Sequence, residues 1–382
     1  MEATTKAYNF SRTTLRLAVG AMFFMTGLCF ASWASRIATI QQNLHLSDAG
    51  LGGVLFALPV GLMCSLPFSG WVITRIGSRN LLIGALTVYS LALVTLGAAQ
   101  NTVQLIVCLL VFGFASNAVN ISVNTQAVAA EELYKRPILA SFHGLWSLAG
   151  FTGAAIGTFM IGKQVIPFKH FSLIMAVIIV AVIFTSRYLK NDKPASAGPV
   201  FVMPDNSLIK LGIVAFCSLI CEGAMFDWSV IYFKKVVLAQ SALMGAGYTA
   251  FMLTMATGRF VADKFAHRFG LKRTLQISGL LTATGLLTAV ALPYLYTALF
   301  GFLLVGFGVS SVVPLVYSAA GKSKTMSPGV ALAAVSTIGF LGFLIGPPLI
   351  GFIAGIATLR ASFTLIAVMG LCVTFFATKA RI

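Results

Sequence analysis

The sequence contains two copies of one unit. Short phrases recur at a constant offset of 193 residues: Arg75-Ile76-Gly77 returns as Arg268-Phe269-Gly270, and Gly113-Phe114 returns as Gly306-Phe307. Both copies are strongly apolar, since 58% of the residues are hydrophobic and only 9% are charged. In soluble domains about a quarter of the residues are charged. A duplicated apolar chain of this kind is typical of a membrane protein built from internal repeats.

Twelve apolar segments are long enough to cross a bilayer, which takes about 20 residues of helix. Six fall in each half: 13–36, 48–72, 79–99, 103–128, 137–162, 168–188, 208–233, 243–266, 273–293, 296–320, 327–356 and 359–379. The apolar runs are continuous rather than alternating, which favours helices over a barrel. We therefore predict an all-α membrane protein with 12 transmembrane helices in two pseudo-symmetric six-helix bundles.

The longest connection divides the two halves. Residues 189–207 contain Pro194, Pro204 and several small or charged residues, with no apolar period. Such a stretch indicates a linker. We predict an N-terminal bundle at 1–188, a cytoplasmic linker at 189–207 and a C-terminal bundle at 208–382.

The net charge of +17 is distributed unevenly over the connections. With the amino terminus in the cytoplasm, 20 of the 26 Lys and Arg lie on the cytoplasmic side, Arg259 among them, and six, including Arg36, lie outside. This is the positive-inside pattern, and it predicts a multi-pass protein with both termini in the cytoplasm. The basic charge therefore indicates a lipid bilayer as partner and no role with nucleic acid.

The two connections that follow the second and eighth spans are alike. Gly70 to Arg79 and Gly258 to Arg273 each hold a glycine followed by clustered basic residues. They resemble the signature loop of the major facilitator superfamily, although the first copy has Thr74 where the family has Asp. The resemblance implies a conformational latch on the cytoplasmic side, formed by Arg75, Gly77, Arg79, Asp263, Arg268 and Gly270. The alternative is a simple topology anchor.

Several further phrases resemble a bacterial branch of that superfamily. They are Trp33-Ala-Ser-Arg36-Ile, Asn120-Ile-Ser-Val-Asn124-Thr-Gln126, His143-Gly-Leu-Trp146-Ser and Glu222-Gly-Ala-Met-Phe-Asp227-Trp228-Ser. They look like the YbjJ-type inner membrane proteins and, more distantly, the fucose-permease-type sugar:proton symporters. The resemblance implies a monomer in the bacterial cytoplasmic membrane that works by alternating access around a central cavity.

Only two acids lie deep within a span. Glu222 and Asp227 are both on the seventh span, and a charge at that depth is costly enough to call for a reason. A carboxyl group that takes up a proton loses its charge, which is what proton coupling requires. Both are therefore candidates for proton coupling, Glu222 first. The alternative is structural pairing, for which Arg36 and Lys234 are available to Asp227.

Polar side chains on the fourth and fifth spans are candidates for binding the solute. Asn117, Asn120 and Asn124 share one helix face, and amides both donate and accept hydrogen bonds. His143 and Trp146 lie one turn apart on the fifth span. Interhelical hydrogen bonding, a satisfied histidine and interior packing are the structural alternatives.

Three residues near outer span ends complete the set of binding candidates. Trp33 and Trp228 are candidates for contact with the solute, or alternatively belong to the aromatic belt at the membrane interface. Arg36 is a candidate for an anionic group of the solute, or alternatively snorkels outward.

The repeat separates packing residues from candidate functional residues. At the offset of 193, Glu222 falls opposite Cys29 and Asp227 opposite Ala34, while Asn117, Asn124 and His143 fall opposite Ser310, Tyr317 and Ser336. The glycines are repeated, but the acids, amides and imidazole are not. We therefore expect the repeated residues to serve packing and the unrepeated polar ones to serve the solute.

Together these observations predict a secondary active transporter of a small polar solute, driven as a symporter by the proton gradient. A proton-coupled exporter of a metabolite or drug, and a non-transporting membrane sensor, remain as alternatives. We expect no enzyme, no cofactor and no metal site, because the sequence has neither a Ser-His-Asp set nor a nucleotide-binding Gly-rich loop, and its six Cys lack His or acid partners at ligand spacing.

Overall fold

The computed structural model describes residues 11–134, 138–190, 206–320 and 328–379, so most of the predicted linker lies outside the described residues. Over these ranges the chain forms helices and no strand. The helices are α1 (Arg12–Asn43), α2 (Asp48–Leu55), α3 (Ala57–Ala98), α4 (Thr102–Tyr134), α5 (Leu139–Gly162), α6 (Pro167–Thr185), α7 (Asn206–Lys235), α8 (Ala246–Phe269), α9 (Leu271–Ala291), α10 (Leu295–Ser310), α11 (Val312–Ala320), α12 (Pro328–Ile356) and α13 (Leu359–Lys379), with 3₁₀ turns η1 (Ser186–Tyr188) and η2 (Ser241–Leu243).

Eleven helical stretches of the described chain are long and apolar enough to cross a membrane. The one predicted span outside these eleven is the eighth, 243–266, which corresponds to α8, whose hydropathy is lowered by charged residues such as Arg259 and Asp263. The span predicted at 48–72 is broken at Phe56 into α2 and the start of α3, and α3 continues past Gly77 into the next predicted span. The prediction of an all-α protein of the transmembrane class is confirmed.

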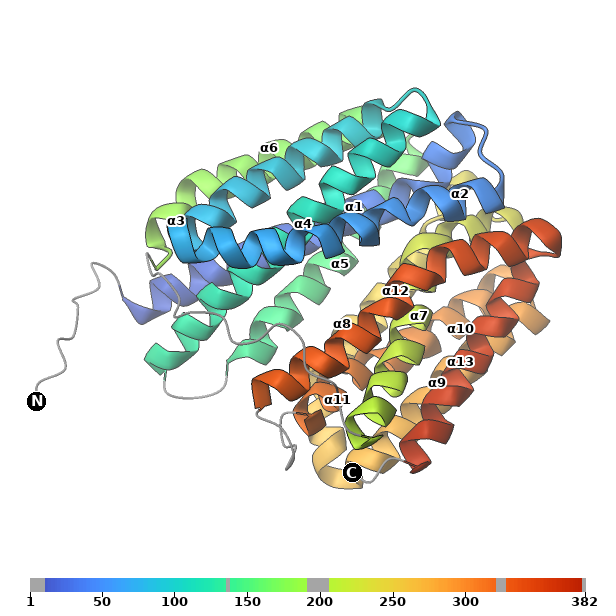
Figure 1. Ribbon diagram of the computed structural model, residues 1–382. Coiled ribbons are helices and arrows are strands. Elements are labelled where there is room, and N and C mark those ends of the chain that lie inside the picture. Colours follow the sequence, from blue (N-terminus) through green and yellow to red (C-terminus); the bar gives the residue numbers. More distant parts are fainter. Residues whose placement is uncertain (1–10, 135–137, 191–205, 321–327, 380–382) are drawn as a thin grey trace, which may run out of the picture.

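The helices form two bundles, α1 to α6 and α7 to α13 (Figure 1). In the first bundle α1 packs on α5 and α3 packs on α4; in the second α7 packs on α12, and α9 packs on α10 and α13. We call the end of the molecule where α1 starts and α13 ends the linker side, and the opposite end, where α1 ends and α2 starts, the loop side.

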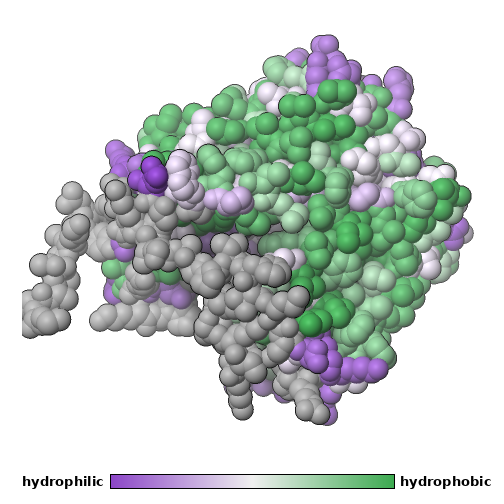
Figure 2. Space-filling view, viewed as in Figure 1, coloured by the Kyte–Doolittle hydropathy of each residue, from purple (hydrophilic) through white to green (hydrophobic). Residues whose placement is uncertain are grey.

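The bundles meet on the loop side and diverge toward the linker side (Figure 1). On the loop side α2 packs against α12. The contact of α5 with α8 is longer and extends to Gly144 near the start of α5, where an added Cβ would lie 2.5 Å from the ring of Phe260. Gly52 of α2 is so close to Gly351 of α12 that an added Cβ on Gly52 would lie 2.9 Å from the Cα of Gly351. Toward the linker side the space-filling surface is hollowed between the bundles, beside the residues drawn in grey (Figure 2).

The outer surface suits a hydrocarbon environment. Large apolar side chains such as Ile183, Phe184, Phe352 and Ile356 are more than half exposed, and Figure 2 shows hydrophobic residues across the visible face with hydrophilic residues toward its ends. Apolar exposure on this scale marks a surface that another apolar phase covers.

The repeat is visible in the backbone as well as in the sequence. Gly77 has φ 81° and ψ 161°, and Gly270, its partner at the offset of 193, has φ 80° and ψ 155°. This region of φ and ψ is essentially restricted to glycine. His45 and Leu238 are a second pair at the same offset, with φ 51° and 55°. The two halves therefore turn in the same way at equivalent points.

The repeated glycines serve close helix packing, as expected. A Cβ on Gly113 of α4 would meet the backbone of Leu58 in α3, and a Cβ on Gly306 of α10 would meet the backbone of Phe251 in α8. Leu58 and Phe251 are themselves separated by 193 residues. Both bundles thus use the same pair of positions to bring two helix backbones together.

Candidate functional site

A buried ion pair joins two helices of the second bundle. Nη2 of Arg259 on α8 lies 3.3 Å from Oε1 of Glu222 on α7, and the two side chains are 17% and 6% exposed. The same guanidinium donates from Nη1 to Oγ of Ser147 on α5, at 2.7 Å. Arg259 therefore connects Glu222 to the other bundle, in the middle of the molecule.

An aromatic ring lies against the same guanidinium. The Cζ atom of Arg259 is 5.5 Å from the centroid of the Trp146 ring, within the range of a cation–π contact. Trp146 is half-buried and comes directly before Ser147. Two adjacent residues of α5 thus hold Arg259, one through its ring and one through its hydroxyl group.

A layer of aromatic rings covers this group on its loop side. We call Phe30, Trp146, Phe226, Tyr248, Phe251 and Phe343 the aromatic layer. Phe226, one turn beyond Glu222 on α7, makes ring contacts with the other five members, at centroid distances between 5.1 and 6.3 Å. Phe226 is 3% exposed. Because the members come from both bundles, the layer closes the space between them beyond Glu222.

Two predicted binding residues on the fourth span lie together, and the third lies apart. Nδ2 of Asn124 donates to Oδ1 of Asn120 at 2.9 Å, and Asn120 is exposed. Asn117 is buried, and its Nδ2 has no hydrogen-bond partner. The stripe therefore divides into an accessible amide pair and a buried, unsatisfied amide.

His143 also belongs to the accessible group. Its side chain is exposed, its ring packs on Phe23 at a centroid distance of 5.3 Å, and it lies within electrostatic reach of Arg259.

The residues opposite Asn124 and His143 in the repeat lie close together, in the second bundle. Tyr317 lies beside Ser336 and within electrostatic reach of Glu222. Equivalent positions of the two bundles thus bring polar groups toward the central ion pair.

Asp227 has no partner among the described residues. It is half-buried, and in the described part of the chain it has neither a hydrogen-bond nor an ion-pair partner. Arg36 instead donates to Nδ1 of His170 and to the carbonyl of Val165, and Lys234 donates to Gln42. The structural alternative, in which one of these cations pairs with Asp227, is not found in this structure, because both are held by neutral groups nearer the loop side.

Three outer candidates lie inside the protein rather than at its surface. Trp33, Trp228 and Arg36 are each at most 1% exposed. An interface belt and outward snorkelling are therefore both wrong for these side chains. The indole N–H groups of both tryptophans have no partner, and the Trp33 ring packs on Phe112 at 6.2 Å.

Within the described chain, the predicted latch residues make no hydrogen bond, ion pair or ring contact across the bundles. Nε of Arg79 donates to the carbonyl of Ser186 in its own bundle, while Arg75 and Arg268 lie over the rings of Trp71 and Phe269. The side chain of Asp263 lies outside the described residues. Gly77 lies at the kink of α3 and Gly270 joins α8 to α9. On the linker side the bundles are apart in this structure (Figure 1).

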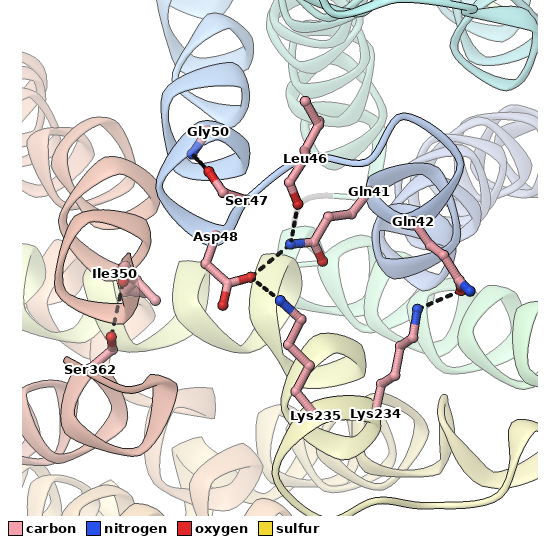
Figure 3. A network of polar contacts seen from close by, with 10 residues as sticks. All are labelled: Gln41, Gln42, Leu46, Ser47, Asp48, Gly50, Lys234, Lys235, Ile350 and Ser362. Carbon is pink, nitrogen blue, oxygen red and sulfur yellow. Dashed lines mark hydrogen bonds and ion pairs between the residues drawn. The ribbon is translucent and has the colours of Figure 1, made fainter. Parts of the chain in front are cut away.

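A polar network joins the bundles on the loop side instead (Figure 3). Asp48 accepts from Nζ of Lys235 at 2.5 Å and from Nε2 of Gln41 at 2.7 Å, and Lys234 donates to Gln42. Gln41 and Gln42 are the counterparts of Lys234 and Lys235 at the offset of 193. The ends of α1 and α7 are therefore equivalent positions that contact each other across the two bundles.

Sequence reasoning missed Arg259, the residue at the centre of the site. It was assigned to the cytoplasmic surface, but it lies ten residues before the end of α8, about 15 Å inside that end. The signal was present in the repeat, because Leu66 stands opposite Arg259. The comparison of the two halves, applied to basic residues as well as to acids and amides, would have found it.

Comparison with known proteins identifies relatives over nearly the whole chain. The family model described as Major Facilitator Superfamily matches residues 17–323 and again 211–381. An uncharacterised MFS-type transporter of Yersinia pestis is 32% identical over 355 residues, which are 92% of each chain. The membrane protein MosC of Rhizobium meliloti is 31% identical over 373 residues, which are 95% of this chain and 90% of that one.

Solved structures share the fold at low sequence identity. The nucleoside transporter NupG has a TM-score of 0.75 and 13% identity, covering 96% of this chain and 98% of NupG. A bacterial homologue of the human lysosomal transporter Spinster, in an inward-facing and unoccupied conformation, has a TM-score of 0.73 and 14% identity, covering 98% of both chains.

Proposed function

Because the chain belongs to the major facilitator superfamily, we propose that it is a proton-coupled symporter that carries a small polar solute across the bacterial cytoplasmic membrane. Membership of this family supports secondary transport and argues against an enzyme. The coupling ion, the direction and the solute class are our proposal, and they rest on the geometry around Glu222.

The observation that carries the proposal is the pairing of Glu222 with Arg259. A proton on Glu222 would remove the negative charge that holds Nη2 of Arg259. The guanidinium would then have hydrogen-bonding capacity free for a solute, while Ser147 and Trp146 kept it in place. Loss of the proton would restore the pair and displace the solute. Proton binding and solute binding would in this way favour each other.

The polar groups around the pair suit a small hydroxylated or amide-bearing solute. Asn120 and His143 are exposed, and both can donate and accept hydrogen bonds. The Trp146 ring offers a flat apolar face beside them. The proposal keeps four more remote residues as candidate contacts of the solute: Asn117, Asn124, Trp33 and Trp228. It keeps Arg36 as a candidate contact of the solute only in a state in which the loop side is open.

The proposed cycle uses the two ends of the molecule in turn. The excess of basic residues in the linker-side connections supports a cytoplasmic linker side, with both termini there. The structure would then be the inward-open state, closed on the outside by the aromatic layer and the loop-side network. In the opposite state the linker side would close, and Arg75, Arg79, Asp263 and Arg268 would come into reach of the other bundle. We propose that one chain completes the cycle as a monomer, without a cofactor.

The test is transport by purified protein in liposomes. A thermal-shift screen of sugars, organic acids, amino acids and nucleosides would first supply a solute. Glu222→Gln should then lose proton-driven accumulation but keep counterflow of labelled solute, because the cavity remains while the proton site is gone. The matched variant is Asp227→Asn on the same helix, which should keep both activities.

The same experiment can contradict the proposal. Undiminished proton-driven accumulation by Glu222→Gln would exclude Glu222 as the coupling residue. Loss of proton-driven accumulation in Asp227→Asn alone would assign the coupling role to Asp227. Solute efflux driven by an inward proton gradient would indicate an exporter. Binding of the solute without any flux would indicate a sensor.

A further inference from the structure

A partly open cavity lies between the bundles on the loop side, away from the central ion pair. It has a volume of about 220 Å³ and is lined by α1, the α5–α6 connection, the end of α7 and η2. We call it the loop-side cavity. Lys234, at its edge, is 12 residues beyond Glu222 on α7, or about 18 Å along the helix. The aromatic layer separates it from the proposed solute site.

The first cation of this cavity is Arg36. Its side chain is 1% exposed and lines the cavity. Nε donates to Nδ1 of His170 at 3.2 Å, and Nη2 donates to the carbonyl of Val165 at 2.7 Å. Both partners are neutral, since an imidazole nitrogen that accepts a hydrogen bond carries no proton. Nη1 makes no hydrogen bond with the described protein and is not enclosed, which leaves it free to reach the cavity.

The second cation, Lys234, comes from the other bundle. It is held by the side-chain oxygen of Gln42, which is again neutral (Figure 3). The nearest acid in the network, Asp48, is already bound by Lys235 and Gln41 and does not line the cavity. The described lining of the cavity therefore holds two cations and no acid.

The remaining lining residues add neutral donors. They include the amides of Gln42, Asn43 and Gln164 and the hydroxyls of Thr39 and Ser241. A guanidinium, an ammonium and several amide or hydroxyl donors are the groups that bind carboxylate and phosphate oxygens in proteins. A cavity of this volume has room for such a group, since a water molecule takes about 30 Å³.

We propose that the loop-side cavity is a binding site for a small oxyanion, of the phosphate or carboxylate type, held between Arg36 and Lys234. The anion supplies the negative charge that neither cation finds in the protein. Because Arg36 belongs to the first bundle and Lys234 to the second, the bound anion joins the two bundles and favours the state in which the loop side is closed. This site is independent of the proposed coupling at Glu222, so either proposal can fail alone.

The experiment uses the full-length protein in nanodiscs and inorganic phosphate as the probe. In phosphatidylcholine nanodiscs, phosphate should raise the melting temperature, because a ligand that binds only the folded state stabilises it. Chloride at equal ionic strength should not. Lys234→Gln should raise the dissociation constant for phosphate about tenfold, since it removes one of the two positive charges that bind the anion.

Two matched variants and a lipid exchange complete the design. Lys235→Gln removes the adjacent lysine, which does not line the cavity, and should leave phosphate binding unchanged. Arg36→Lys keeps the charge but loses the planar group, and it reports on Arg36 if Arg36→Gln does not fold. Phosphatidylglycerol nanodiscs without added phosphate test whether a lipid headgroup supplies the oxyanion.

Each outcome decides the proposal. Stabilisation by phosphate that depends on Lys234 supports a free anion. Stabilisation by phosphatidylglycerol that depends on Lys234 and removes the phosphate effect supports the same site filled by a headgroup. Equal phosphate binding by the wild type and Lys234→Gln, or no binding of either oxyanion, would overturn it.

Discussion

Arg259 holds Glu222 at 3.3 Å in the second bundle while its other terminal nitrogen is bound to Ser147 of the first. The contacts of one guanidinium thus depend both on the charge of Glu222 and on the relative position of the two bundles. A change at Glu222 reaches the interface between the bundles through a single side chain. Under the proposed coupling, this arrangement would give proton binding at Glu222 a direct route to a change in the relative position of the bundles.

The pair should show strong coupling in stability measurements. Arg259→Gln leaves the Glu222 carboxylate buried without its cation, so we expect the free energy of unfolding to fall by about 1–3 kcal/mol. This is less than for a fully buried ion pair, because Arg259 is partly exposed. The double variant Glu222→Gln with Arg259→Gln should recover part of that loss, since it removes both charges. The apparent melting temperatures of the two single variants and the double variant measure this coupling.

A purely structural contact would give a different result. If Arg259 contributed only packing, the two single effects would add in the double variant. Ser147→Ala is the matched control, because it removes a neutral partner of Arg259 and leaves the ion pair in place. Its effect should be smaller than that of Arg259→Gln.

The repeat in the sequence predicted the fold because it marks positions that serve the backbone. Gly77 and Gly270 recur since both turns need a conformation open only to glycine, and Gly113 and Gly306 recur since two backbones meet there. The candidate site is harder to predict, because its residues are specific to one half. Glu222 was identified from its depth alone, but its partner lies 37 residues further along the chain, on another helix.

The errors in the sequence reasoning have a common physical origin. Depth along a span can be counted from the sequence, but direction around the helix cannot. Trp33, Trp228 and Arg36 lie near span ends, yet their side chains point into the protein. In the same way, Lys234 lies close to Asp227 along α7 but binds Gln42 at the loop side.

The two glycine turns should tolerate no side chain. Gly77→Ala and Gly270→Ala force a Cβ into a region of φ and ψ that only glycine occupies, at a cost of about 1–3 kcal/mol each. Gly84→Ala is the control, because Gly84 lies inside α3 with nothing within 4 Å of an added Cβ. It should keep or raise the melting temperature, since alanine favours a helix by about 1 kcal/mol over glycine. Equal melting temperatures for all three variants would contradict the requirement for glycine at the two turns.

The ion pair on the loop side should act on conformation more than on stability. Lys235 is 42% exposed, and exposed pairs contribute about 0–1 kcal/mol. Asp48→Asn should therefore shift the balance between closed and open loop sides by up to about fivefold. Distances between spin labels at Gln100→Cys and Leu292→Cys, in a variant without the six native cysteines, would report the shift. Lys163→Gln, on the loop side but outside the network, should leave the distance distribution unchanged.

The contact between α2 and α12 offers the sharpest test of the closed loop side. A Cβ on Gly52 would lie 2.7 Å from the carbonyl oxygen of Pro347 and 2.9 Å from the Cα of Gly351. Both neighbours are backbone atoms, so Gly52→Ala must push the bundles apart, at a cost of about 1–3 kcal/mol in the closed state only. The adjacent Gly53→Ala has the same gain in helix propensity, but nothing lies within 4 Å of its added Cβ. With the labels at Gln100→Cys and Leu292→Cys, Gly52→Ala should populate longer distances and Gly53→Ala should match the wild type. Identical distributions for both variants would show that the two bundles do not separate at this contact, and that the loop side opens elsewhere if it opens at all.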